Sequence, residues 1–98
     1  MILNIDDSNQ GLEFGIANIY PNPFNPLVNF DIQLSRTEDV DISIYDIMGH
    51  KVFNIHSGIL NQGIHSFYWD AGNKATGIYM IQCQNKNSVS TQKVLLMK

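Results

Sequence analysis

The sequence predicts an all-β fold, an immunoglobulin-like antiparallel β-sandwich of about seven strands. Short segments alternate apolar and polar residues, turn residues separate them at intervals of roughly 8 to 14 residues, and no segment has the period of a helix. With 98 residues the chain has room for one domain with one core.

The first expected strand covers residues 14–20, after a polar linker or frayed first segment at residues 1–13. The sandwich domain is therefore expected at residues 14–98. We expect the sequence to be an excised or truncated piece of a longer chain that carries a signal peptide upstream, because the first ten residues lack the basic start and apolar stretch of such a peptide.

The stretch from Tyr20 to Pro26 contains all three prolines of the chain. Each proline fixes its own φ and keeps the preceding residue out of the helical region, so we expect a stiff, extended, kinked strand at the edge of the domain. Turns are expected at Asn22 and Asn25, and Phe24 is expected to anchor in the core. A polyproline II ligand is the alternative, but no basic residues flank the prolines as in such ligands.

Residues 27–35 alternate most clearly, with the apolar members Val28, Phe30, Ile32 and Leu34. After a polar turn at residues 36–39, residues 40–45 alternate in the same way. Their polar side, which includes Ser43, is expected to face solvent.

Asp46 to Gly49 fits a type I turn, in which Asp46 accepts backbone hydrogen bonds and Gly49 takes a positive φ. The chain then returns as a strand over residues 50–56, and a loop is expected from Ser57 to Gly63. The next strand, residues 64–69, directs Phe67 and Trp69 to one side and Tyr68 to the other. Trp69, the only tryptophan, is expected to fill the core.

Two further turns are predicted, at Asp70–Asn73 and at Thr76–Gly77. The strand that follows, residues 78–84, has Tyr79, Ile81 and Cys83 on one face. Residues 85–87 form a polar hairpin tip, and residues 88–97 form the last strand.

Composition excludes several classes of protein. The net charge is −3 and there is no run of Lys or Arg, which argues against binding to nucleic acid or to an anionic membrane surface. No apolar stretch reaches 18 residues, so no helix spans a membrane. The single cysteine, Cys83, cannot form an internal disulfide and is expected to be a small buried apolar residue.

The sequence contains no recognisable catalytic or cofactor site, so we expect a domain that is not an enzyme. There is no nucleophile elbow and no phosphate-binding loop, and Cys83 has no neighbour that would lower its pKa. The histidines His50, His56 and His65 lack zinc-site spacing. Two acidic groups, Asp6 with Asp7 and Glu38 with Asp39 and Asp41, could gather calcium, but solvated turn carboxylates are the favoured interpretation.

Five blocks of the sequence, taken together, resemble a known family. They are Tyr20-Pro21-Asn22-Pro23-Phe24-Asn25-Pro26; Ile44-Tyr45-Asp46 with Gly49; Gly63 leading to Trp69-Asp70; Thr76-Gly77-Ile78-Tyr79; and Lys93-Val94-Leu95-Leu96 with a final Lys98. In this order and spacing, from about Asn18 to Lys98, the chain resembles the type A C-terminal sorting domain of type IX secretion substrates, which is related to the immunoglobulin-like domain of flagellar hook-capping proteins.

The resemblance implies a label that does no chemistry and carries an upstream cargo on the same chain through an outer-membrane translocon. The cargo then reaches the surface or the medium of a Gram-negative bacterium. A sortase-like peptidase commonly removes the label and joins the cargo to lipopolysaccharide. The residues that the resemblance marks for recognition by the translocon are Thr91, Lys93, Val94, Leu95, Leu96 and Lys98.

From the residues alone, an apolar last strand that ends in lysine can offer an edge for strand addition, or it can simply close the sandwich. The chain departs from the family at Leu27-Val28, where small hydroxyl residues are usual, and at Cys83, where a larger aliphatic is usual. Both departures affect packing. The alternatives are a structural immunoglobulin-like module of a surface or flagellar hook-capping protein, and a carbohydrate-binding module that uses Tyr45, Tyr68 and Tyr79.

Overall fold

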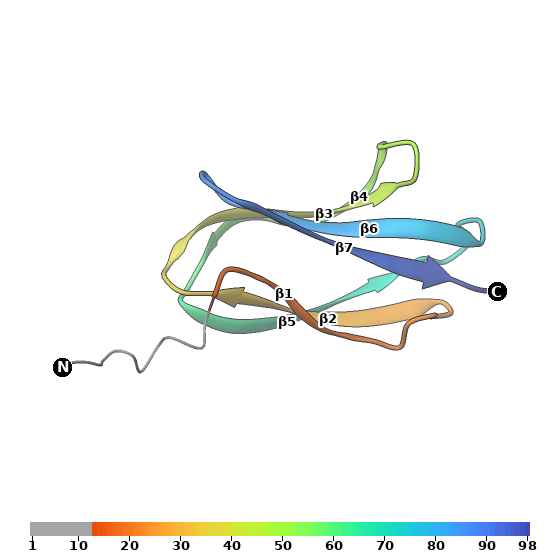
Figure 1. Cartoon of the computed structure of the whole chain (residues 1–98), viewed down its shortest axis with the longest axis horizontal. Helices are drawn as coiled ribbons and strands as arrows, with labels where there is room; N and C mark the ends of the chain where they lie inside the picture. The colour runs from red at the N-terminus through yellow and green to blue at the C-terminus, as the bar shows by residue number, and fades with distance from the viewer. Residues whose placement is uncertain (1–12) are drawn as a thin grey trace.

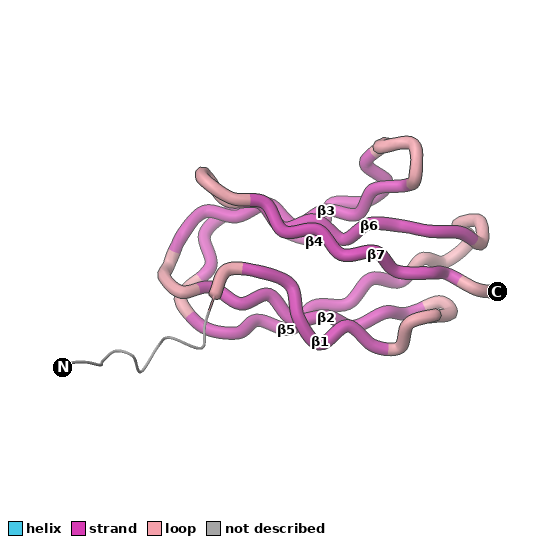
Figure 2. Tube along the Cα trace, viewed as in Figure 1, coloured by secondary structure: helices cyan, strands magenta, loops and turns pink. Residues whose placement is uncertain are grey.

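The fold is a sandwich of two packed antiparallel sheets, as the sequence predicts (Figures 1 and 2). We analysed a computed structural model, which describes residues 13–98. The predicted linker at residues 1–13 lies outside the described residues except for Glu13, and so do Asp6 and Asp7. The strands are β1 (Gly15–Tyr20), β2 (Leu27–Leu34), β3 (Glu38–Asp46), β4 (Lys51–Leu60), β5 (Gly63–Asp70), β6 (Gly77–Gln84) and β7 (Val89–Leu96).

One sheet has three strands in the order β1-β2-β5, and the other has four in the order β4-β3-β6-β7. Strand β7 is therefore an edge strand of the larger sheet. Residues 13–98 contain no helix of the length and apolarity that crossing a membrane requires.

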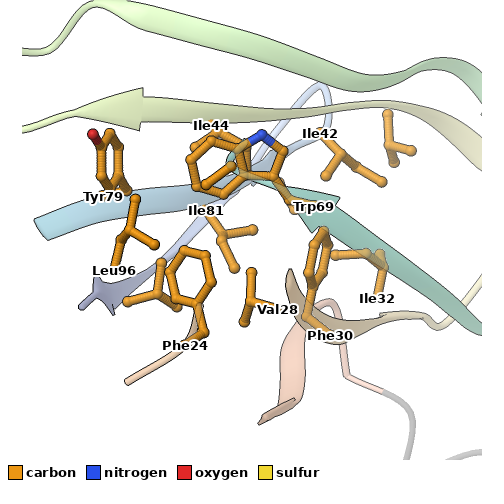
Figure 3. Packing of buried hydrophobic residues seen from close by; sticks show 14 of the residues in the cluster. Phe24, Val28, Phe30, Ile32, Ile42, Ile44, Trp69, Tyr79, Ile81 and Leu96 are labelled. Atoms are coloured by element: carbon orange, nitrogen blue, oxygen red, sulfur yellow. The ribbon is translucent and has the colours of Figure 1, made fainter. Parts of the chain in front are cut away.

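The core lies between the two sheets and is built from the alternating positions that the sequence singles out (Figure 3). Phe24, Trp69 and Tyr79 meet near one end of it, and the ring of Trp69 lies 5.8 Å from that of Phe24 and 5.3 Å from that of Tyr79. Tyr68 points the other way and is 63% exposed, which confirms the predicted facing of this strand. The buried apolar residues are Phe24, Val28, Phe30, Ile32, Leu34, Val40, Ile42, Ile44, Trp69, Ala71, Tyr79, Ile81, Cys83, Val94 and Leu96.

Tyr79 fixes the corner between β5 and β6. Its phenolic hydroxyl donates to the backbone carbonyl of Ala75 at 2.6 Å. A tyrosine near the start of the sixth strand that bonds back to the chain a few residues upstream is a hallmark of immunoglobulin-like sandwiches.

The prediction for the proline segment was wrong in one respect. Phe24 is buried as expected, but the segment is not a strand. It forms a bent connection that carries the chain from β1 back into β2, with which β1 pairs in antiparallel fashion. We call residues 21–26 the proline loop.

The predicted loop from Ser57 to Gly63 was also wrong, because β4 continues to Leu60. Ser57 pairs with Asp41 and Gly58 with Val40, so this part of the chain remains in the ladder with β3. The Ser57 hydroxyl also donates to Asp41 Oδ1 at 2.8 Å. Because these partners lie on a distant segment, the local sequence at Ser57 and Gly58 shows only residue types that are typical of turns.

Ser43 was expected to face solvent, yet it is fully buried. The register between β3 and β4 shifts beside it, between Ile42 and Ser43. Its hydroxyl donates to Asp41 Oδ2 at 3.0 Å and accepts from Asn54 Nδ2 at 2.9 Å. Burial of this polar group is tolerated because its hydrogen bonds are satisfied within the protein.

Candidate functional site

Strand β7 contains five of the six residues marked for recognition, and the fold divides them into two groups. Val94 and Leu96 face the core and are 2% and 0% exposed. Thr91 and Lys93 are exposed, and Leu95 is half-buried on the outer face of the sheet. Lys98 follows the strand and is exposed. A binding partner can therefore reach the second group while the domain stays folded.

The outer edge of β7 is covered over its second half by the proline loop. The Phe24 N–H donates to the carbonyl of Leu95 at 2.9 Å, and the Met97 N–H donates to the carbonyl of Phe24 at 3.0 Å. The Asn22 amide adds two contacts, with the Leu95 N–H at 2.9 Å and the Lys93 carbonyl at 3.5 Å. The edge expected for strand addition is therefore not free along its whole length.

The first half of β7 makes no hydrogen bond to the proline loop within the described residues, and the start of β1 lies beside it, where a Cβ added at Gly15 would be 3.5 Å from Ser90 Oγ. Alternate residues of an edge strand direct both backbone groups to the same side. Because Leu95 directs its groups outward, Val89 and Thr91 do so as well, and within residues 13–98 no further strand pairs with β7 on that side.

A shallow hollow of about 240 Å³ lies beside the covered half of the strand. Its walls are formed by Asn22, Ile78, Lys93, Val94 and Leu95. Ile78 pairs directly with Leu95 across β6 and β7, so the two aliphatic side chains lie together on the outer face. The hollow combines aliphatic side chains with the residue Lys93 in its lining.

Parts of all five sequence blocks lie at the end of the sandwich where β7 finishes, whereas Gly63 of the third block starts β5 at the opposite end. The proline loop, the β3–β4 turn and the β5–β6 loop lie at the right of Figure 1 with the end marked C, whereas the described chain begins at the opposite end. The Lys98 N–H donates to Thr76 Oγ1 at 3.2 Å, which ties the last residue to the fourth block. We call this end, with its three connections and residues 97–98, the motif end.

The β3–β4 turn has the geometry that the sequence predicts. Asp46 Oδ1 accepts from the N–H groups of Met48 and His50, both at 2.9 Å, and the Gly49 N–H donates to the Asp46 carbonyl at 3.0 Å. Gly49 has a φ of 87°. The backbone N–H of His50 holds the pKa of Asp46 below its usual value. The turn exposes Ile47 and Met48, which are 68% and 76% accessible.

The block around Asp70 forms the predicted turn and is joined to the proline loop. The Gly72 N–H donates to Asp70 Oδ1 at 2.8 Å, and the Ala71 N–H donates to the Pro26 carbonyl at 2.9 Å. Hydrogen bonds thus link the first block to the fifth block and to the residue that directly follows the third.

Charged residues of both signs lie at each end of the sandwich. Lys51, Lys74 and Lys98 belong to the motif end or directly adjoin its turns, as do Asp46 and Asp70. Arg36 and Lys86 lie toward the opposite end together with Glu38 and Asp39. The motif end therefore combines exposed apolar side chains with exposed lysines, a combination that suits a partner surface with apolar and acidic parts.

The other candidate groups lie apart from one another. Within residues 13–98 no three His, Cys, Asp or Glu side chains come together as they would around a metal ion. His50 lies 3.3 Å from Asp46, the ring of His56 is tilted against that of Phe67, and His65 bonds the carbonyl of Asn61. In the predicted acidic group, Glu38 accepts from Asn85 and lies 3.7 Å from Arg36, Asp41 accepts from Ser43, Asn54 and Ser57, and Asp39 is exposed.

Cys83 and the tyrosines complete the survey of predicted residues. Burial raises the pKa of Cys83 to about 12, so its thiol stays protonated. Tyr79 is buried beside Trp69, Tyr45 is half-buried on β3, and Tyr68 lies on the other sheet. These three tyrosines form no common binding face.

Comparison with known proteins identifies a family. The model of the family described as "Secretion system C-terminal sorting domain" matches residues 18–97, which is most of the chain. A search of curated proteins finds no match. The matched region begins within β1 and ends directly after β7, so it includes the five sequence blocks except for Lys98.

Proposed function

This chain belongs to the family of secretion system C-terminal sorting domains, and we propose that the type IX machinery reads it through exposed side chains at its motif end. The domain is a non-catalytic sorting domain for type IX secretion of cargo proteins. It interacts with the type IX secretion machinery, and its cargo crosses the outer membrane to the surface or the medium.

We propose that the machinery recognises the domain through Thr91, Lys93, Leu95 and Lys98. The observation that carries this proposal is the division of the last strand, in which Val94 and Leu96 lie in the core while the other marked residues are accessible. In this proposal Val94 and Leu96 act indirectly, because they hold the strand in the fold. The translocon contacts the lysines and the hollow beside Leu95.

The cargo would join the domain at the end away from this surface. The described chain begins at Glu13, opposite the motif end (Figure 1). A cargo that precedes the domain would leave the motif end free for the translocon. Removal of the label by a sortase-like peptidase would then take place within residues 1–13, ahead of the first strand.

An export assay tests the proposal. The 98-residue chain is fused behind a signal peptide and a fluorescent reporter and expressed in a bacterium with an active type IX system. Deletion of residues 88–98 would be a poor test, because it also removes Val94 and Leu96 from the core. The informative variant is Lys93→Ala with Lys98→Ala, with Lys86→Ala in the hairpin tip at the opposite end as the matched control.

We expect the double variant to leave most of the reporter in the periplasm, and we expect Lys86→Ala to be exported like the parent chain. Equal urea midpoints for the three proteins would show that folding is not the cause. Normal export of the folded double variant would refute the assignment to these lysines. Retention of the parent chain itself would favour the structural immunoglobulin-like module.

A further inference from the structure

The side chain of Asn22 connects the first sequence block to the last. We propose that Asn22 is a positioning residue for the sorting signal, which holds the backbone of β7 so that Lys93, Leu95 and Lys98 keep the arrangement that the machinery reads. This inference rests on the function proposed above. It concerns a residue that does not itself need to touch the translocon.

The side chain of Asn22 forms hydrogen bonds with two backbone groups on the outer edge of β7, which would otherwise bond only to water. Asn22 Oδ1 accepts from the Leu95 N–H at 2.9 Å, and Nδ2 donates to the Lys93 carbonyl at 3.5 Å. One side-chain amide therefore contacts two outward-facing residues of β7, although Asn22 precedes Leu95 by 73 positions in the chain. Both positions are among those assigned to recognition.

The neighbouring contacts of Phe24 serve the fold as well as the strand. The Phe24 backbone bonds Leu95 and Met97, and its ring is buried against Trp69. Asn22, in contrast, is exposed, so its side chain can be changed without opening the core. Its amide also forms a wall of the hollow that contains Lys93 and Leu95. Loss of this amide would therefore change the candidate site with little effect on the stability of the sandwich.

The same loop contains a matched control. Asn25, like Asn22, is exposed and directly precedes a proline. Its side chain makes no hydrogen bond to another residue of the described range. Asn22→Ala and Asn25→Ala therefore make the same chemical change in the same local context, and only the first removes contacts with β7. Asn22→Asp keeps the acceptor for the Leu95 N–H and removes the longer donor contact.

Amide hydrogen exchange measured by NMR on the 98-residue chain tests the contact. A hydrogen bond of ordinary net strength corresponds to a change in local opening of roughly 5- to 10-fold. We expect Leu95 to exchange that much faster in Asn22→Ala and to be unchanged in Asn25→Ala. In Asn22→Asp it stays within about twofold of the parent chain. Unchanged exchange at Leu95 in Asn22→Ala would overturn the inference.

The export assay then tests the positioning role. We expect Asn22→Ala to lower export several-fold at an unchanged urea midpoint, and we expect Asn22→Asp and Asn25→Ala to be exported like the parent chain. Faster exchange at Leu95 with normal export would refute the positioning role and leave the assignment of Lys93 and Lys98 intact. Normal export of the double lysine variant would instead overturn the proposed function, and this inference with it.

Discussion

Replacement of Trp69 by alanine removes the largest side chain of the core. Trp69 is 2% exposed, and it contacts the rings of Phe24 and Tyr79. A buried aromatic side chain withdraws about 150 to 250 Å² from water, worth about 4 to 6 kcal/mol at about 25 cal/mol per Å². The Cβ that alanine retains reduces the lost area, and partial collapse limits the added cost of the cavity, so we expect Trp69→Ala to cost about 3 to 5 kcal/mol.

A loss of that size is a large part of the stability of a small domain, which is about 5 to 15 kcal/mol in total. It corresponds to a fall in Tm of about 12 to 40 °C for a chain of this length. The free energy of unfolding can be measured by urea titration followed by circular dichroism, because the substitution removes the only tryptophan fluorophore.

Tyr68→Ala is the matched control. Tyr68 is the preceding residue on the same strand, and it points to solvent at 63% exposure. We expect its loss to change the free energy of unfolding by less than about 1 kcal/mol, since surface substitutions have small effects. A cost below 1 kcal/mol for Trp69→Ala, or equal costs for the two variants, would refute the reasoning, because the ring would then not be supporting the core.

Three other properties can be measured on the same chain. Gly49→Ala is expected to lower the free energy of unfolding by about 1 to 2 kcal/mol through backbone strain alone, because φ is 87° and an added Cβ would meet no atom within 4 Å; an unchanged urea midpoint would disprove the turn geometry. Cys83 is expected to react with iodoacetamide at pH 8 only after unfolding, because burial raises its pKa to about 12; equal rates with and without urea would contradict its burial. Hydrogen bonds from Asn18 and Ser66 lower the pKa of Asp31, so its contribution to stability is complete above the ordinary aspartate pKa of about 3.9 and is lost as the pH falls through the lower folded value. Asp31→Asn is therefore expected to weaken the pH dependence of the urea midpoint below pH 4. The same pH dependence in the variant and the parent chain would count against this role of Asp31.

The sequence was sufficient to predict the features that depend on local pattern. In β2, apolar residues at every second position mark the buried face, and all four of Val28, Phe30, Ile32 and Leu34 are buried. The turn at Asp46 was also predictable, because its contacts lie within four residues along the chain. Periodicity and turn chemistry act over short distances, so a single sequence records them directly.

The features that the sequence could not predict depend on partners far along the chain. Nothing near Ser57 and Gly58 indicates that they stay in the ladder, because their partners are in β3. Ser43 looks like a solvent-facing residue until Asn54 is brought beside it by the irregular register of β3 and β4. The sequence of the proline loop likewise does not predict that the loop covers β7, since its partners lie more than 70 residues away.

If the machinery recognises exposed residues of β7, as we propose, the alternation of this strand makes recognition depend on folding. Neighbouring residues of the strand point to opposite faces, so the packing of Val94 and Leu96 in the core necessarily turns Lys93 and Leu95 outward. An unfolded chain carries the same residues but keeps neither this division nor the hollow beside Asn22. If the machinery reads the exposed group, it distinguishes a folded label from an unfolded one without any further contact. A core substitution such as Leu96→Ala would then reduce export only to the extent that it unfolds the domain, whereas loss of Lys93 and Lys98 would reduce export at full stability.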